Sequence, residues 1–112
     1  TALIPALVES GFPSDRFGFE GFLAPKKGRQ KRLLGLKEEA RTLIFYESPH
    51  KLLKTLDQFQ EVFGPDREVS VSRELSKLYG ETIRGTLETV AEYFKEHTPK
   101  GEFVLVLRGA AS

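Results

Sequence analysis

The chain has 112 residues, of which 39% are hydrophobic and 29% charged, and its formal net charge is +1. These values indicate one globular domain with a modest core, and they exclude a disordered chain. A nearly neutral chain has no global field that attracts nucleic acid or an anionic membrane, so any basic surface must be local. The sequence contains no cysteine, which excludes disulfides, thiolate metal sites and a cysteine nucleophile and fits a reducing, cytoplasmic setting.

The first part of the chain predicts a helix, a strand and a second helix. Residues 1–10 carry an apolar helical stripe, and Gly11 can end that helix. Residues 17–23 alternate in the manner of a half-buried strand. A cation-rich loop over residues 24–30 follows, and leucines predict a helix from about Gln30 to Ala40.

The central stretch predicts a strand over residues 42–47, a sharp polar turn, and a helix over residues 48–63. Ser48 can cap this helix. Capping does not require Glu47 or His50. In open α/β sheets ligands bind at the carboxyl ends of strands, so these two residues are the first candidates for a site.

The last part predicts a strand over residues 68–73, a polar loop, and a short strand over residues 81–84. Thr86 then caps a helix, although the capping box has a threonine where glutamate is preferred. The continuous apolar run at residues 103–107 predicts a central strand buried on both faces. The order of elements defines an α/β fold, with one sheet of about five strands flanked by helices.

Three stretches carry residues suited to chemistry. Glu47 and His50 offer an acid and an imidazole for proton transfer, although a helix cap with an exposed Glu47 and His50 is the simpler explanation. A single histidine makes a poor metal ligand set, so no metal is expected. The loop after residue 72 contains Arg73 and Lys77, and it is either a solvated loop or part of a site at the same sheet edge. Residues 26–32 form a run that is either a solvated helix entrance or a phosphate-contacting patch. Its cations are Lys26, Lys27, Arg29, Lys31 and Arg32.

Several common signatures are missing from the chain. It contains no glycine-rich nucleotide motif, nucleophile elbow or aromatic RNA-binding motif. No apolar stretch approaches the length of a membrane span, and no signal-peptide pattern occurs, so no membrane partner is expected. The chain starts at Thr1 and has no methionine, from which we expect a piece of a longer protein. Taken alone, the residues define half of a site.

Four runs resemble one known family in their order and spacing. They are TALIPALVESGFPSDRFGFEGFLAPKKGR, FYESPHKLLKTL, SRELSKLYGETIRGTL and GEFVLVLRG. Together they resemble the carboxyl-terminal domain of the small-subunit ribosomal RNA methyltransferases, a branch of the tetrapyrrole methylase superfamily. The resemblance implies that residues 1–112 are the second domain of a two-domain class III methyltransferase, with a mixed five-stranded sheet.

The same resemblance implies a function for the whole enzyme. S-adenosylmethionine would lie in the cleft between two domains, of which the amino-terminal one is absent here. The enzyme would be a cytoplasmic homodimer, and it would methylate a cytidine ribose 2′-hydroxyl in the 16S rRNA of the small ribosomal subunit. With half of the cleft missing, the fragment alone is expected to be inactive.

Site residues follow from the resemblance position by position. Thr1 and Ala2 match a pair that contacts the cofactor, and Glu47 falls where relatives have a cofactor-lining methionine. Leu75 matches a residue whose backbone meets the adenine, and Val106 is expected to close that side.

The chemistry requires a group that accepts the ribose proton or stabilises an alkoxide. The candidates Glu47 and Lys77 are favoured for this catalytic role. Arg73, His50 and the basic run are expected to bind RNA. Two other readings remain open, a tetrapyrrole-precursor methyltransferase and a non-catalytic binding module, and the sequence upstream of Thr1 would separate all three.

Overall fold

A computed structural model of the chain describes residues 3–23, 27–74 and 82–111. The elements follow the predicted order. They are α1 (Leu3–Ser10), β1 (Phe17–Phe22), α2 (Arg29–Leu36), β2 (Thr42–Glu47), α3 (Leu52–Phe63), β3 (Glu68–Glu74), β4 (Thr82–Thr86), α4 (Leu87–Glu96) and β5 (Glu102–Leu107). The strands form one five-stranded sheet in the order β1-β2-β5-β3-β4. β1 is parallel to β2, whereas β5 is antiparallel to β2 and β3, which confirms the mixed sheet.

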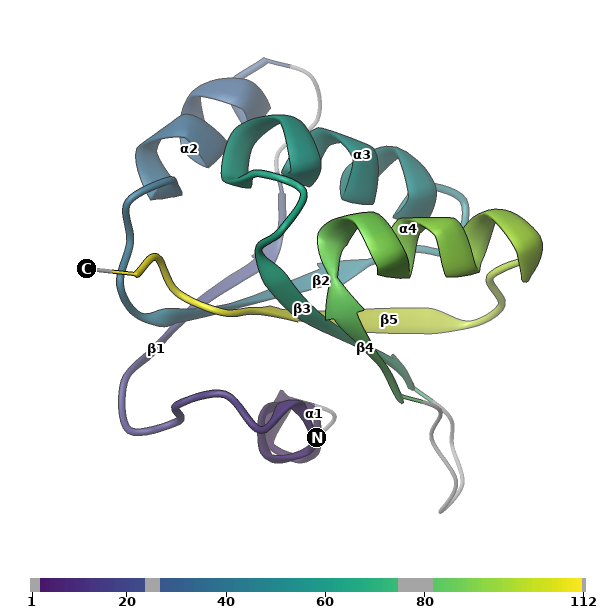
Figure 1. Cartoon of the computed structure of the whole chain (residues 1–112), viewed down its shortest axis with the longest axis horizontal. Helices are drawn as coiled ribbons and strands as arrows, with labels where there is room; N and C mark the ends of the chain where they lie inside the picture. Colours follow the sequence, from purple (N-terminus) through teal and green to yellow (C-terminus); the bar gives the residue numbers. More distant parts are fainter. Residues whose placement is uncertain (1–2, 24–26, 75–81, 112) are drawn as a thin grey trace.

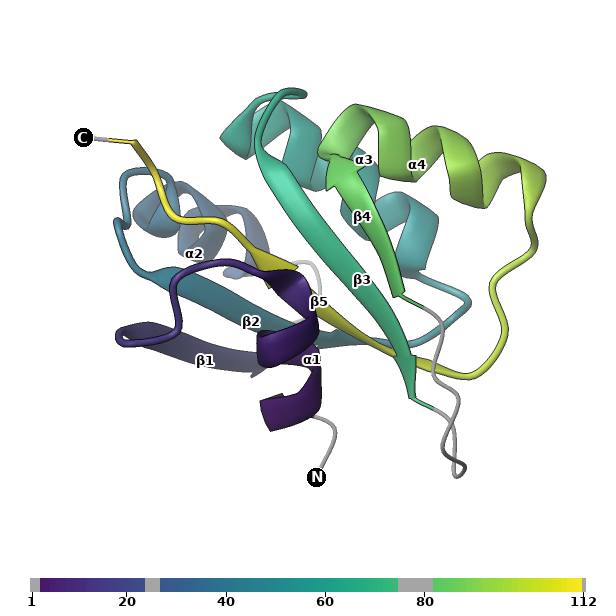
Figure 2. The ribbon, with the colours of Figure 1, turned by 60° about the horizontal axis from the view of Figure 1, so that its bottom comes forward.

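The sheet separates two hydrophobic layers. Helices α2, α3 and α4 cover one face, and α1 lies on the other (Figures 1 and 2). The larger core cluster joins the three helices to one face of β2, β3 and β5, and the smaller cluster joins α1 to Ile44, Val104 and Val106. Strand β5 is fully buried from Phe103 to Leu107 and is the central strand. The apolar run is continuous because each face of β5 meets a different core.

Two predicted helix boundaries were wrong. Helix α3 begins at Leu52, its N-cap is Lys51, and no side-chain cap bond forms there, so Ser48 is not the cap. Ser48 instead starts a turn in which its own carbonyl accepts the Lys51 N–H at 3.2 Å, and the helix begins only after this turn. Helix α2 ends at Leu36 rather than Ala40 because residues 37–40 supply no further leucine to the core stripe.

Strand β1 forms as predicted and is half-buried, and glycines rather than phenylalanines occupy its buried side. Gly18 and Gly21 are the buried residues, and Phe17, Phe19 and Phe22 are 36%, 50% and 63% exposed. The register shifts between Phe19 and Gly21, which marks a β-bulge, and Gly21 has the positive φ of 64° that a bulge glycine supplies.

The predicted cap of α4 is present. Thr86 Oγ1 accepts the Thr89 N–H at 3.2 Å, and Thr89 Oγ1 accepts the Thr86 N–H at 3.0 Å. Threonine therefore replaces glutamate in a working capping box. We expect Thr86→Ala to lower the free energy of unfolding by about 1 kcal/mol in urea titrations. Thr98→Ala, at an exposed loop position, is the matched control, and equal losses from both variants would contradict the capping role.

Candidate functional site at one edge of the sheet

The carboxyl ends of β1, β2 and β3 lie at the same edge of the sheet. β1 is parallel to β2, and both β2 and β3 run antiparallel to β5. Glu47 and Arg73 each pair with Phe103, so these three residues form one row across the sheet. Residues paired in this way point to the same face, and two strand spacings separate Glu47 from Arg73 by roughly 10 Å. The ends of β2 and β3 thus bring a carboxylate and a guanidinium to one edge.

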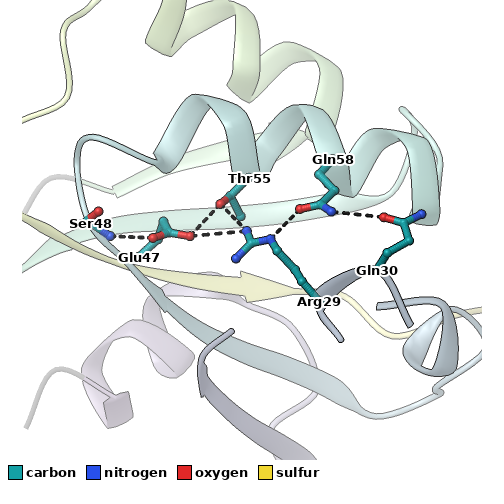
Figure 3. A network of polar contacts seen from close by, with 6 residues as sticks. All are labelled: Arg29, Gln30, Glu47, Ser48, Thr55 and Gln58. Atoms are coloured by element: carbon teal, nitrogen blue, oxygen red, sulfur yellow. Dashed lines mark hydrogen bonds and ion pairs between the residues drawn. The ribbon is translucent and has the colours of Figure 1, made fainter. Parts of the chain in front are cut away.

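Glu47 is buried beneath this edge and held by three neighbours (Figure 3). The residue is 5% exposed. Its Oε1 accepts the Ser48 N–H at 2.9 Å, and its Oε2 accepts the Thr55 hydroxyl at 2.6 Å. Arg29 Nη2 lies 3.6 Å from the same Oε2. Both carboxylate oxygens are therefore engaged within the chain.

Arg29 connects the start of α2 to the middle of α3 (Figure 3). Its Nε donates to Gln58 Oε1 and its Nη2 donates to Thr55 Oγ1, both at 2.6 Å. Gln58 Nε2 in turn donates to Gln30 Oε1 at 3.1 Å. The Arg29 side chain is only 14% exposed. This residue, expected to bind RNA, turns its guanidinium toward the protein and ties α2, β2 and α3 together.

The rest of the basic run is more open to solvent. Lys27 and Lys31 are exposed, and Lys26 lies outside the described residues. Arg32 is bidentate to Glu20, at 2.8 Å for each bond, and these bonds raise the pKa of the Arg32 guanidinium. A shallow hollow of about 320 Å³ on α2 is lined by Gly28, Lys31, Arg32 and Gly35. Two cations beside two residues without side chains suit the close approach of a phosphate.

The remaining predicted site residues do not all gather at one place. His50 is exposed in the turn before α3. Arg73 is partly buried, and its Nε has no hydrogen-bond partner among the described residues. Val106 is fully buried under α1, on the face of the sheet opposite Glu47, so these two do not meet. Thr1, Ala2, Leu75 and Lys77 lie outside the described residues.

Two features of this edge escape prediction from sequence. Thr55 and Gln58 stand three residues apart on α3, a spacing that puts both on the side facing Arg29. On the other face of the sheet, the Tyr46 ring lies 5.2 Å from the Phe19 ring and 5.4 Å from the Phe22 ring. The alternation of glycine with phenylalanine in β1 was the available signal for this second cluster.

A second hollow lies at the opposite ends of the strands. It measures about 720 Å³, and its lining includes Thr42, Phe63, Arg67 and Arg108. Burial lowers the pKa of the Arg67 guanidinium, which donates to the carbonyls of Lys37 and Arg108 at 3.2 and 3.1 Å. Arg67 therefore ties the carboxyl-terminal segment to the end of α2.

Metal-site clusters and membrane-spanning helices are both absent from residues 3–23, 27–74 and 82–111. Within these ranges no three or more histidine, cysteine or acidic residues gather as a metal site would require. The helices described there are also too short and too polar to cross a membrane.

Solved methyltransferases share this fold. The chain matches a cobalt precorrin-4 methyltransferase with a TM-score of 0.70 and 12% identity, over 96% of this chain and 48% of that one. It matches the methyltransferase CobJ with a TM-score of 0.70 and 21% identity, over 99% and 48%. It also matches a Thermus thermophilus uroporphyrin-III C-methyltransferase complexed with S-adenyl homocysteine, with a TM-score of 0.61 and 16% identity over 91% and 48%. The fold is thus that of one half of a tetrapyrrole methyltransferase.

Similarity in sequence, unlike similarity in fold, relates the chain to one family and to proteins of one name. The family described as Tetrapyrrole (Corrin/Porphyrin) Methylases matches residues 1–91. Three similar curated proteins are each named "Ribosomal RNA small subunit methyltransferase I". The one from Synechocystis is 53% identical over 98% of this chain and 40% of its own length. Those from Thermotoga maritima and Bacillus subtilis are 44% and 46% identical, each over 97% of this chain and over 49% and 37% of their own lengths.

The chain belongs to the tetrapyrrole methylase family, which confirms the resemblance seen in the sequence motifs. It spans less than half the length of these curated relatives.

Proposed function

We propose that this chain is the carboxyl-terminal domain of a methyltransferase that transfers a methyl group from S-adenosylmethionine to a cytidine ribose 2′-hydroxyl in 16S rRNA. The observation that carries the proposal is 53% identity, over 98% of the chain, to a protein named for small-subunit rRNA methylation. The relatives' greater length supports a second domain that completes the cofactor cleft. In this proposal the whole enzyme is a cytoplasmic homodimer, and this domain alone is inactive.

The sheet edge suits a reaction that depends mainly on alignment. The bound cofactor supplies an activated sulfonium methyl group, and positioning alone can contribute roughly 7–11 kcal/mol to lowering the barrier. Arg73 fits a ligand carboxylate or phosphate because the residue is partly buried and its buried Nε has no hydrogen-bond partner among the described residues. Thr1, Ala2, Leu75 and Val106 complete the proposed cofactor side, with Val106 acting through packing because it is fully buried.

The two catalytic candidates take different parts in this proposal. Glu47 already accepts hydrogen bonds on both oxygens, so we assign it the positioning of the turn that follows β2. Lys77 is assigned to stabilise the ribose alkoxide, because a nearby cation favours the developing charge. His50 and the exposed Lys27, Lys31 and Arg32 are assigned to RNA binding.

The decisive experiment is methyl transfer by the whole protein. Small ribosomal subunits are incubated with tritiated S-adenosylmethionine, and the RNA is digested to nucleosides. We expect label in 2′-O-methylcytidine, and none when this domain alone is used. The family's solved relatives include tetrapyrrole methyltransferases, so a porphyrinoid acceptor is tested in parallel. Label in the porphyrinoid and none in the RNA would refute the proposed substrate.

Lys77→Ala tests the assigned alkoxide stabiliser. Removing one group that stabilises developing charge typically lowers kcat by about 10²–10³-fold. We expect a loss of this size in the whole protein, with unchanged affinity for S-adenosylmethionine by calorimetry. Lys54→Ala, at an exposed position on α3, serves as the control. A Lys77→Ala variant with the normal rate would remove Lys77 from the mechanism.

A further inference from the structure

Strand β1 carries an exposed row of aromatic side chains on the face of the sheet that also holds α1. We call Phe17, Phe19, Phe22 and Tyr46 the aromatic face. The three phenylalanines are 36–63% exposed, and Tyr46 is partly buried between Phe19 and Phe22. Helix α1 packs chiefly on β5, β3 and β4, and it leaves the three phenylalanines of β1 exposed.

The β-bulge is what places Phe22 on this face. Side chains alternate along a strand, so Phe19 and Phe22, three residues apart, would otherwise point to opposite faces. The bulge between Phe19 and Gly21 shifts the register, and Phe22 then pairs with Tyr46 while Phe19 pairs with Ile44. Ile44 and Tyr46 both point toward the α1 side. A backbone irregularity thus assembles one continuous aromatic surface.

Two further features indicate which kind of ligand the aromatic face can bind. Tyr46 meets Phe19 edge-on, with an interplanar angle of 74°, so the rings form a fixed cluster. A cation stands at the start of the strand, since Arg16 directly precedes β1 and is exposed. Exposed aromatic rings beside cations are the usual platform for unstacked bases of single-stranded nucleic acid.

We propose that the aromatic face binds unstacked bases of the RNA substrate, with Phe19 and Phe22 as the stacking platforms and Arg16 near the phosphates. The inference rests on the proposed function and adds to it where the RNA lies. The bulge also disfavours extension of the sheet by a second copy along β1, because it interrupts the regular edge. The aromatic face continues from β1 to Tyr46 near the end of β2, so bound bases would reach the sheet edge that carries Glu47 and Arg73, from the opposite face of the sheet.

The test measures binding of a fluorescent single-stranded RNA of decoding-region sequence to the whole protein. We expect Phe22→Ala to weaken binding roughly 5- to 150-fold, the range for one lost stack. Phe22→Tyr keeps a ring and should bind like the wild type. Leu34→Ala is the matched control because Leu34 is 54% exposed on α2, away from this face. An RNA carrying 4-thiouridine is also cross-linked to the wild-type protein, and the cross-link should map to residues 17–22.

Each outcome decides the inference separately from the proposed function. Weaker binding that tyrosine restores, with a cross-link in β1, supports the aromatic face as an RNA site. Unchanged RNA binding, or a change of oligomeric state or melting temperature without a cross-link in β1, overturns it and assigns the face to protein packing. Wild-type protein that methylates RNA while every variant binds normally would refute this inference alone. Wild-type protein that methylates no RNA would refute the proposed function.

Discussion

Glu47→Ala is expected to lower the free energy of unfolding by about 3–5 kcal/mol, the usual cost of removing one partner from a buried ion pair. The substitution leaves the Arg29 guanidinium, only 14% exposed, without its carboxylate. It also removes the acceptor of the Ser48 N–H and of the Thr55 hydroxyl. Since domains of this size are stable by only about 5–15 kcal/mol, the variant should unfold at a much lower urea concentration.

Glu68→Ala is the matched control for this prediction. Glu68 pairs with Arg108 at 2.9 Å, but both side chains are about half exposed, at 52% and 51%. Solvent screens such a pair, so its loss should cost about 0–1 kcal/mol. Glu47→Gln retains an acceptor for Thr55 and should fall between the two. Similar urea midpoints for Glu47→Ala and Glu68→Ala would contradict a stabilising network around Glu47.

The sequence was sufficient for the order of elements and for the layers because the signals there are local. Alternation, helical stripes and the double-faced apolar run of β5 each reflect which side of an element is buried. The helix α3 connects β2 to β3, and such a crossover connection favours parallel strands. The placement of Glu47 and Arg73 at one edge of the sheet could therefore be anticipated without coordinates.

The side-chain contacts of the site depend on how helices and strands pack against one another. Local sequence patterns predict the elements but not these contacts. Arg29 stood in a run of cations that favoured solvent or RNA, and only the approach of α2 to α3 turns it toward Thr55 and Gln58. Ser48 has the residue type of a cap, yet it starts a turn that closes on Lys51, and the helix begins at Leu52. The bulge in β1 likewise puts Phe22 on the same face as Phe19, which simple alternation does not predict.

Arg29→Met is expected to lower the methylation rate of the whole protein about 10²-fold, the scale of a misplaced reactive geometry. Arg29 is bound to Gln58, Thr55 and Glu47 and faces the protein, so we expect it to act through position rather than by contacting phosphate. Its loss frees the start of α2 and the cationic loop before it. RNA affinity should fall as well, while the slope of log affinity against log salt concentration should not change. Single-turnover rates and salt titrations measure the two effects.

Lys31→Met is the control for Arg29→Met, because it should change the salt slope and leave the methylation rate nearly normal. Lys31 is exposed and lines the hollow on α2, so a phosphate contact there would release a counterion. Its loss should reduce the magnitude of the salt slope by about 0.7 for a single-stranded site, with a nearly normal rate at saturating RNA. A reduced slope in Arg29→Met would show that Arg29 leaves its partners on α3 and binds phosphate directly. The salt slope thus distinguishes Arg29, which positions the basic run, from Lys31, which binds phosphate within it.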